Sequence, residues 1–96
     1  MKNQTAFLDE AFKINIRNPK MPQIGDEDVL VKISHVTICG SDAYFFRDPT
    51  FAGTIVPPIL PIVLGHECGG VIEEVGSNVK HLKKGDRVAI EPGAGC

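Results

Sequence analysis

Apolar and polar residues follow one another in short runs along this chain, and no stretch keeps the 3.6-residue period of a long amphipathic helix. The clearest run is 29–36, which is rich in β-branched residues and places Val29, Val31 and Ile33 on one face of a strand. Lys32 and Ser34 then fall on the other face. Further strands are predicted at 5–8, 12–16, 68–75 and 87–90. The pattern therefore predicts a mainly β fold.

Glycine, proline and acidic residues separate these runs. The acidic pair Asp9-Glu10 is predicted to be the turn between the first two strands, and 76–78 and 84–86 are typical of turns. The segment 57–64 contains three prolines, so we expect an ordered loop or an edge segment there instead of a central strand. Short strands at this spacing are typical of a small barrel or sandwich. Just beyond the run 29–36, Ser41 or Asp42 is able to cap a short helix through Phe46.

Length and composition restrict the classes of function. A chain of 96 residues allows one small domain of modest stability. Its 43% hydrophobic residues and net charge of -2 offer no basic face for nucleic acid. No run approaches the roughly 18 apolar residues of a membrane span, and the first ten residues lack a leader pattern, so a cytoplasmic protein is expected. Three cysteines, an odd number, indicate reduced thiols kept for metal binding or packing.

Two glycine-marked segments carry the candidate chemistry. Cys39-Gly40-Ser41-Asp42 and Gly65-His66-Glu67 offer a thiolate, an imidazole and carboxylates, the ligand types that zinc prefers. The simpler alternatives are that Cys39 is a small buried apolar residue and that His66 is an ordinary hydrogen-bonded histidine. Three further residues have weaker claims as ligands because of their settings, within a strand, in a basic turn and at the start of a strand: His35, His81 and Cys68. Cys68 is expected to pack in the core.

The same motifs carry a resemblance to a known family. ICGSD at 38–42, the strand VLVKI before it, and PIVLGHECGGVIEEVGSNVKHLKKGDRVAIEPG at 61–93 resemble the N-terminal catalytic domain of zinc-dependent medium-chain dehydrogenases, over about two thirds of the chain. The ending AIEPG is most similar to the polyol branch, with sorbitol and xylitol dehydrogenases, and threonine and butanediol dehydrogenases are close relatives. The resemblance implies a GroES-like small β-barrel with a short helix after Cys39. It makes residues 1–96 that domain, incomplete at its C-terminal end and without the family's α/β dinucleotide-binding domain.

The resemblance also implies roles for individual residues. Cys39 and His66 become zinc ligands, and the Ser41 hydroxyl passes the substrate proton towards solvent. Asp42 would accept the remaining ring N–H of His66 and fix its tautomer. Glu67 is either a supporting carboxylate, the interpretation we rank first, or an alternate zinc ligand.

Cys96 occupies the position at which the family opens a structural zinc lobe with four cysteines. One cysteine cannot hold a closed zinc site, so an exposed C-terminal thiol is the preferred interpretation. The lone Gly93-Ala94-Gly95 is followed by no helix and receives no cofactor role. We therefore expect that this chain alone neither binds NAD nor oxidises an alcohol.

For the full-length parent, the resemblance implies a zinc- and NAD-dependent dehydrogenase, a homo-oligomer that oxidises a polyol or secondary alcohol. Two departures leave the substrate open, because Tyr44 stands where these enzymes often carry histidine and Phe45 where an aromatic hydroxyl is common. The resemblance places the stretch 48–58 at the border of the substrate cleft, so that Phe46, Arg47 and Phe51 shape the cleft, and a plain surface loop is the equal alternative. Two other classes stay open, a non-enzymatic GroES-like barrel acting as a binding or oligomeric module, and a structural or storage zinc module, for which four ligands are needed.

Overall fold

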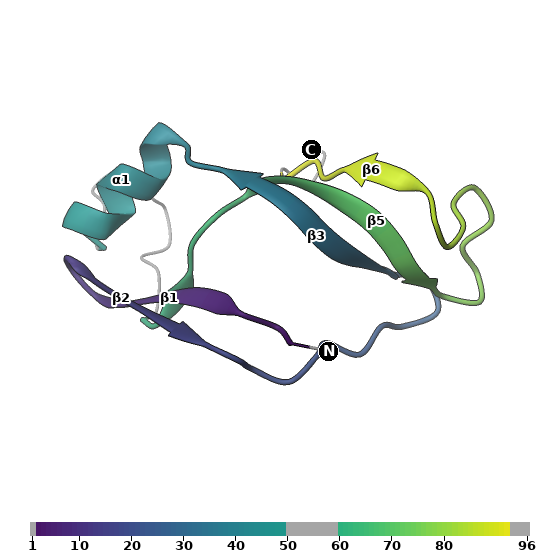
Figure 1. Cartoon of the computed structure of the whole chain (residues 1–96), viewed down its shortest axis with the longest axis horizontal. Coiled ribbons are helices and arrows are strands. Elements are labelled where there is room, and N and C mark those ends of the chain that lie inside the picture. Colours follow the sequence, from purple (N-terminus) through teal and green to yellow (C-terminus); the bar gives the residue numbers. More distant parts are fainter. Residues whose placement is uncertain (1, 50–59, 93–96) are drawn as a thin grey trace. The chain divides into compact units, whose positions relative to one another are not determined.

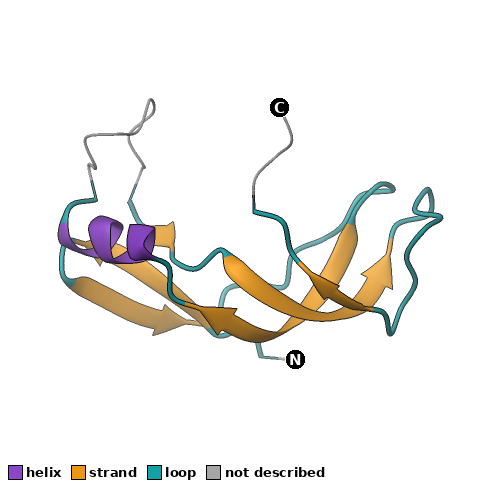
Figure 2. Cartoon of the chain, turned by 90° about the horizontal axis from the view of Figure 1, so that it is seen from above, coloured by secondary structure: helices purple, strands orange, loops and turns teal. Residues whose placement is uncertain are grey.

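The computed structural model describes residues 2–49 and 60–92. The chain divides into two compact units, one formed by Met1–Met21 and Ile38–Gly65, the other by Pro22–Thr37 and His66–Cys96. Each unit contains one three-stranded antiparallel sheet, with strand orders β2-β1-β4 and β3-β5-β6 (Figure 1). The described residues include one helix, the short α1 of the first unit, which is purple in Figure 2. The prediction of a mainly β fold with a short helix is confirmed, and closure into a barrel stays a prediction.

The first unit is built on a hairpin. Strands β1 (Thr5–Glu10) and β2 (Lys13–Arg17) pair antiparallel, and β4 (Ile62–Val63) adds to the other side of β1. Leu8 pairs with both Ile14 and Ile62, and its side chain is fully buried. The described part of the proline-rich segment therefore supplies a short edge strand, the second of the two alternatives that its sequence left open.

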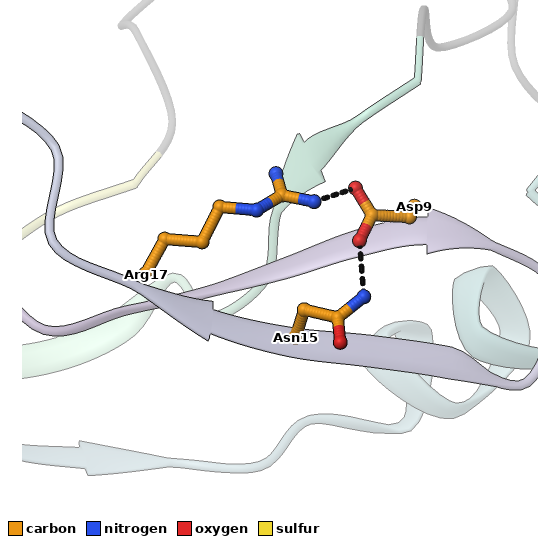
Figure 3. A network of polar contacts seen from close by, with 3 residues as sticks. All are labelled: Asp9, Asn15 and Arg17. Carbon is orange, nitrogen blue, oxygen red and sulfur yellow. Dashed lines mark hydrogen bonds and ion pairs between the residues drawn. The ribbon is translucent and has the colours of Figure 1, made fainter.

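The turn of this hairpin differs from the prediction. Asp9 and Glu10 lie inside β1, and the turn is Ala11-Phe12, so the acidic pair does not separate the strands. Figure 3 shows the reason, because the Asp9 carboxylate accepts hydrogen bonds from the side chains of Asn15 and Arg17 across the hairpin. The hydrogen bond from Asn15, and then that from Arg17, lowers the pKa of Asp9 below its ordinary value. The cross-strand contacts thus hold this acidic residue within the sheet.

The second unit centres on β5 (Glu67–Val75), which lies between β3 (Val29–Thr37) and β6 (Arg87–Ala89). All three strands were predicted to within one residue at each end. Ile72 supplies the fully buried side chain of this sheet. At Gly70 a Cβ atom would lie 2.1 Å from the carbonyl oxygen of Lys32, so the close approach of β3 and β5 requires glycine.

The helix α1 (Gly40–Arg47) begins earlier than predicted. Its N-cap residue is Cys39, with φ -96° and ψ 156°, and neither Ser41 nor Asp42 occupies that position. Asp42 acts from inside the first turn, where its Oδ2 accepts the backbone N–H of Cys39 at 3.0 Å. Within residues 2–49 and 60–92, no helix has the length and apolar character that crossing a membrane requires.

Candidate metal centre

The pairing of β3 with β5 determines where the two candidate segments lie. Thr37 is the register partner of Glu67, at the end of β3 and the start of β5, and its hydroxyl donates to the Glu67 carbonyl at 3.4 Å. Cys39 follows Thr37 by two residues, and His66 directly precedes Glu67. Segments 27 residues apart in sequence (39 and 66) therefore leave the sheet at the same end.

Three potential ligand atoms gather at this end of the strands. The Sγ atom of Cys39, a ring nitrogen of His66 and a carboxylate oxygen of Glu67 all lie within 4.8 Å of one another. Two atoms that share a zinc ion at the tetrahedral angle stand about 3.5 Å apart, given bonds of about 2.3 Å to sulfur and 2.0 Å to nitrogen. Cys39 and His66 are half-buried and Glu67 is exposed. The donor types, a thiolate, an imidazole and a carboxylate, are those that zinc takes in proteins.

Local backbone geometry presents these residues. Gly65 has φ of 100°, a conformation that favours glycine, and it turns the chain immediately before His66 and the start of β5. Cys39 has extended backbone angles as the N-cap of α1, so its side chain stands at the junction of strand and helix. Each candidate ligand is thus placed by an element end, where a small residue or a cap sets the direction of the chain.

Ser41 and Asp42 occupy the first turn of α1 and are both half-buried. One contact of Asp42 is the hydrogen bond from the Cys39 backbone, which ties the acidic residue to the residue that we expect to bind metal. The predicted hydrogen bond from the His66 ring to Asp42, and the predicted proton transfer through Ser41, stay predictions.

The other residues considered from the sequence stay outside the cluster. Among the described residues, the group of Cys39, His66 and Glu67 includes neither of the other histidines and no second cysteine. His35 is exposed with its Nδ1 3.1 Å from the Ser34 hydroxyl, and His81 is also exposed. Cys68 is half-buried opposite the exposed Val36, so it does not belong to the fully buried core. Phe51, Cys96 and the segment 93–95 lie outside the described residues.

Two contacts of α1 were not predicted from the sequence. The Arg47 guanidinium lies over the ring of Tyr44, 5.4 Å from its centroid. Phe46 packs against Phe12 of the β1–β2 turn, with ring centroids 5.2 Å apart. Spacing along one helix could have suggested the first pair, which is separated by three residues. No sequence pattern connects Phe12 with Phe46, since their contact depends on the fold of the first unit.

Comparison with known proteins places this arrangement in a family. Residues 25–96 match the family described as the alcohol dehydrogenase GroES-like domain. The chain belongs to this family. Among the described residues of the matched segment are the whole Cys39, His66 and Glu67 cluster and the paired strands β3 and β5 that position it.

Individual proteins are also similar to this chain over nearly its whole length. The chain is 47% identical over 95 residues to the L-idonate 5-dehydrogenase of Vitis vinifera, covering 99% of this chain and 25% of that protein. It is 44% identical over 95 residues to the sorbitol dehydrogenase of Arabidopsis thaliana, covering 99% and 26%. A crystal structure of an Escherichia coli oxidoreductase of unknown specificity superposes with a TM-score of 0.85 at 42% identity, covering 100% and 27%. The chain thus spans about a quarter of the length of the relatives it matches.

Proposed function

We propose that this chain is the N-terminal GroES-like part of a zinc-dependent, NAD-linked dehydrogenase that oxidises a polyol or a secondary alcohol. The observation that carries the proposal is the cluster of Cys39, His66 and Glu67, whose ligand atoms lie within 4.8 Å of one another. The polyol class is supported by the names of relatives, an L-idonate 5-dehydrogenase and a sorbitol dehydrogenase. In such a protein residues 1–96 would form most of a small β-barrel.

Cys39 and His66 would hold the zinc ion, and Glu67 would support the site or serve as an alternate ligand. Bound zinc acts as a Lewis acid that lowers the pKa of a hydroxyl group. The half-buried position of the two ligands and the exposure of Glu67 agree with a site that has a protein side and an open side. An open side is what a catalytic zinc site needs for its substrate.

Ser41 is the candidate for proton transfer. Its hydroxyl both accepts and donates a hydrogen bond, so it can take a proton from a substrate while it passes its own proton to solvent. It lies two residues beyond Cys39 in the first turn of α1. Its side chain is half-buried, so part of it contacts protein and part of it contacts water. NAD would supply the hydride acceptor for the alcohol carbon, and the family's dinucleotide-binding domain would hold it.

The test is a longer protein that carries this chain at its N-terminus. It should reduce NAD with sorbitol, xylitol or a similar diol, and a chelator should abolish the activity. His66→Ala should eliminate turnover, and Ser41→Ala should lower kcat about 100-fold or more, as expected for loss of a proton-transfer group. Ser77→Ala is the matched control, because the Ser77 hydroxyl donates to Asp26 in an exposed turn, and it should keep full activity.

Activity that persists after complete metal removal would contradict the zinc assignment. The isolated 96-residue chain should neither bind NAD in calorimetry nor oxidise the same alcohols. A measurable affinity of the short chain for NAD would show that the cofactor assignment to another domain is wrong.

A further inference from the structure

The turn between β1 and β2 contains an unusual residue. Phe12 has φ of 64°, the left-handed region that glycine adopts readily and that a residue with a Cβ atom adopts at a cost. Its side chain is 66% exposed, so burial of apolar surface does little to repay that cost. A bulky residue in this conformation requires specific contacts that hold it there.

Those contacts are both made with the last turn of α1. The backbone N–H of Phe12 donates to the carbonyl oxygen of Phe46 at 2.8 Å. This carbonyl belongs to the C-terminal end of the helix, where the last carbonyls lack partners within the helix. The two rings meet edge to face, at 5.2 Å between centroids and 72° between planes. The hairpin turn therefore caps and holds the C-terminal end of α1 (Figure 1).

The other end of the same helix carries the candidate chemistry. Cys39 is the N-cap, Ser41 is in the first turn, and the carbonyl oxygen of Cys39 accepts the Asp42 N–H at 3.0 Å. An α-helix rises 1.5 Å per residue as a hydrogen-bonded rod, so fixing one end of eight residues restricts the direction of the other. A contact at Phe46 can thus restrict how Cys39 and Ser41 are presented.

We propose that Phe12 is a positioning residue, which holds α1 at its C-terminal end so that Cys39 and Ser41 are presented at the metal centre. This inference rests on the proposed function, because it assigns a purpose to the orientation of Cys39. Glycine at position 12 would satisfy the backbone without strain, but it would lose the ring contact with Phe46. Phenylalanine at position 12 therefore makes the turn less stable than glycine would, but it provides the ring contact that holds α1.

Phe12→Gly separates the effect of Phe12 on stability from its effect on metal binding, because the variant should gain stability and lose Co²⁺ affinity. The variant should be as stable to urea as the wild-type chain or more so, since strain at positive φ is relieved. Its Kd for Co²⁺, followed through the thiolate-to-cobalt charge-transfer band, should rise about 10-fold, the lower end of the range for residues that orient ligands. Amide exchange of Asp42, measured without metal, should accelerate. Phe12→Tyr keeps the ring and should restore wild-type behaviour in all three measurements.

Two further variants make the result specific. Ile16→Ala removes a similarly exposed apolar side chain (63%) from the same hairpin and should leave Co²⁺ binding unchanged. Phe46→Leu as a single variant should weaken Co²⁺ binding. Combining it with Phe12→Gly should weaken Co²⁺ binding little further, because both changes remove the same ring contact. Unchanged Co²⁺ affinity in Phe12→Gly, or a loss no greater than the loss of folded protein, would overturn the proposal. Co²⁺ binding that survives Cys39→Ser would instead refute the proposed metal site, while Asp42 exchange would still decide whether Phe12 holds the helix.

Discussion

The backbone N–H of Cys39 donates a hydrogen bond to Oδ2 of Asp42, 3.0 Å away. This contact starts α1 directly at the residue that we propose as a zinc ligand, so helix formation and ligand placement depend on the same carboxylate. A carboxylate in the first turn also interacts favourably with the positive end of the helix dipole. Asp42 therefore has a structural role that can be separated experimentally from any role at the metal.

Asp42→Ala and Asp42→Asn should differ in their effects. Alanine removes the acceptor for the Cys39 N–H and should lower the free energy of unfolding by about 0.5–2 kcal/mol. Asparagine keeps an acceptor oxygen and loses only the charge, so it should cost less than about 1 kcal/mol. If Asp42 also orients His66, asparagine should still weaken zinc binding by roughly 10- to 100-fold. Urea unfolding of the metal-free chain and a separate zinc titration measure the two effects, and equal zinc affinity for wild type and Asp42→Asn would leave Asp42 only its structural role.

The 96-residue chain should bind zinc weakly. Cys39 and His66 supply two ligands and Glu67 at most a third, whereas closed structural sites use four. Competition with a chromogenic chelator should therefore remove the metal readily, and Cys39→Ser or His66→Ala should abolish the remaining binding. Cys68→Ser and His81→Ala are matched controls outside the cluster and should bind as the wild type does. A tight stoichiometric zinc site that persists in Cys39→Ser would contradict the assignment of Cys39 as a ligand.

Gly70→Ala should severely destabilise the second unit. The added Cβ would lie 2.1 Å from the Lys32 carbonyl oxygen and 2.9 Å from the Ile33 Cα, both backbone atoms of the paired strand β3. We expect a loss of about 3 kcal/mol or more, because overpacking that must move backbone is expensive. Gly40→Ala is the control, since its Cβ would meet nothing within 4 Å at the start of α1, and it should be neutral or slightly stabilising. Comparable thermal unfolding midpoints for the two variants would contradict the close approach of β3 and β5.

Acid should weaken the hairpin of the first unit through Asp9. The hydrogen bond from Asn15, then that from Arg17, lowers the pKa of Asp9 from its ordinary value of 3.8. A lowered folded-state pKa means that the stabilisation is present above pH 3.8 and is lost as the pH falls through the folded value. Carboxyl titration by NMR should show this depressed pKa, and Asn15→Ala should move it upward. Asp86, whose pKa is lowered by Lys83, is an internal reference that Asn15→Ala should not change.

Much of this protein could be predicted from local sequence. The runs 29–36, 68–75 and 87–90 became β3, β5 and β6 with small changes at their ends, because β-branched residues bounded by turn residues have few alternatives. Cys39 and His66, with Glu67 beside His66, were identified as candidates from two glycine-marked segments that carry zinc-type side chains, and their role at a metal stays a prediction. These features depend on residues that are close together in the chain.

Tertiary structure decided what depends on distant residues. The hairpin turn moved from Asp9-Glu10 to Ala11-Phe12 because Asn15 and Arg17 hold Asp9 within the strand, and this cross-strand contact exists only after the strands pair. Phe12 adopts a positive φ although no local pattern favours phenylalanine there. Its backbone N–H donates to the carbonyl oxygen of Phe46 in α1, and its ring packs against the Phe46 ring. Thr37 and Glu67 are register partners, so the segments that carry Cys39 and His66 leave β3 and β5 at the same end of the sheet. Local propensity is determined within a few residues, whereas register and ring contacts depend on how separate segments pack, and one sequence window does not contain that information.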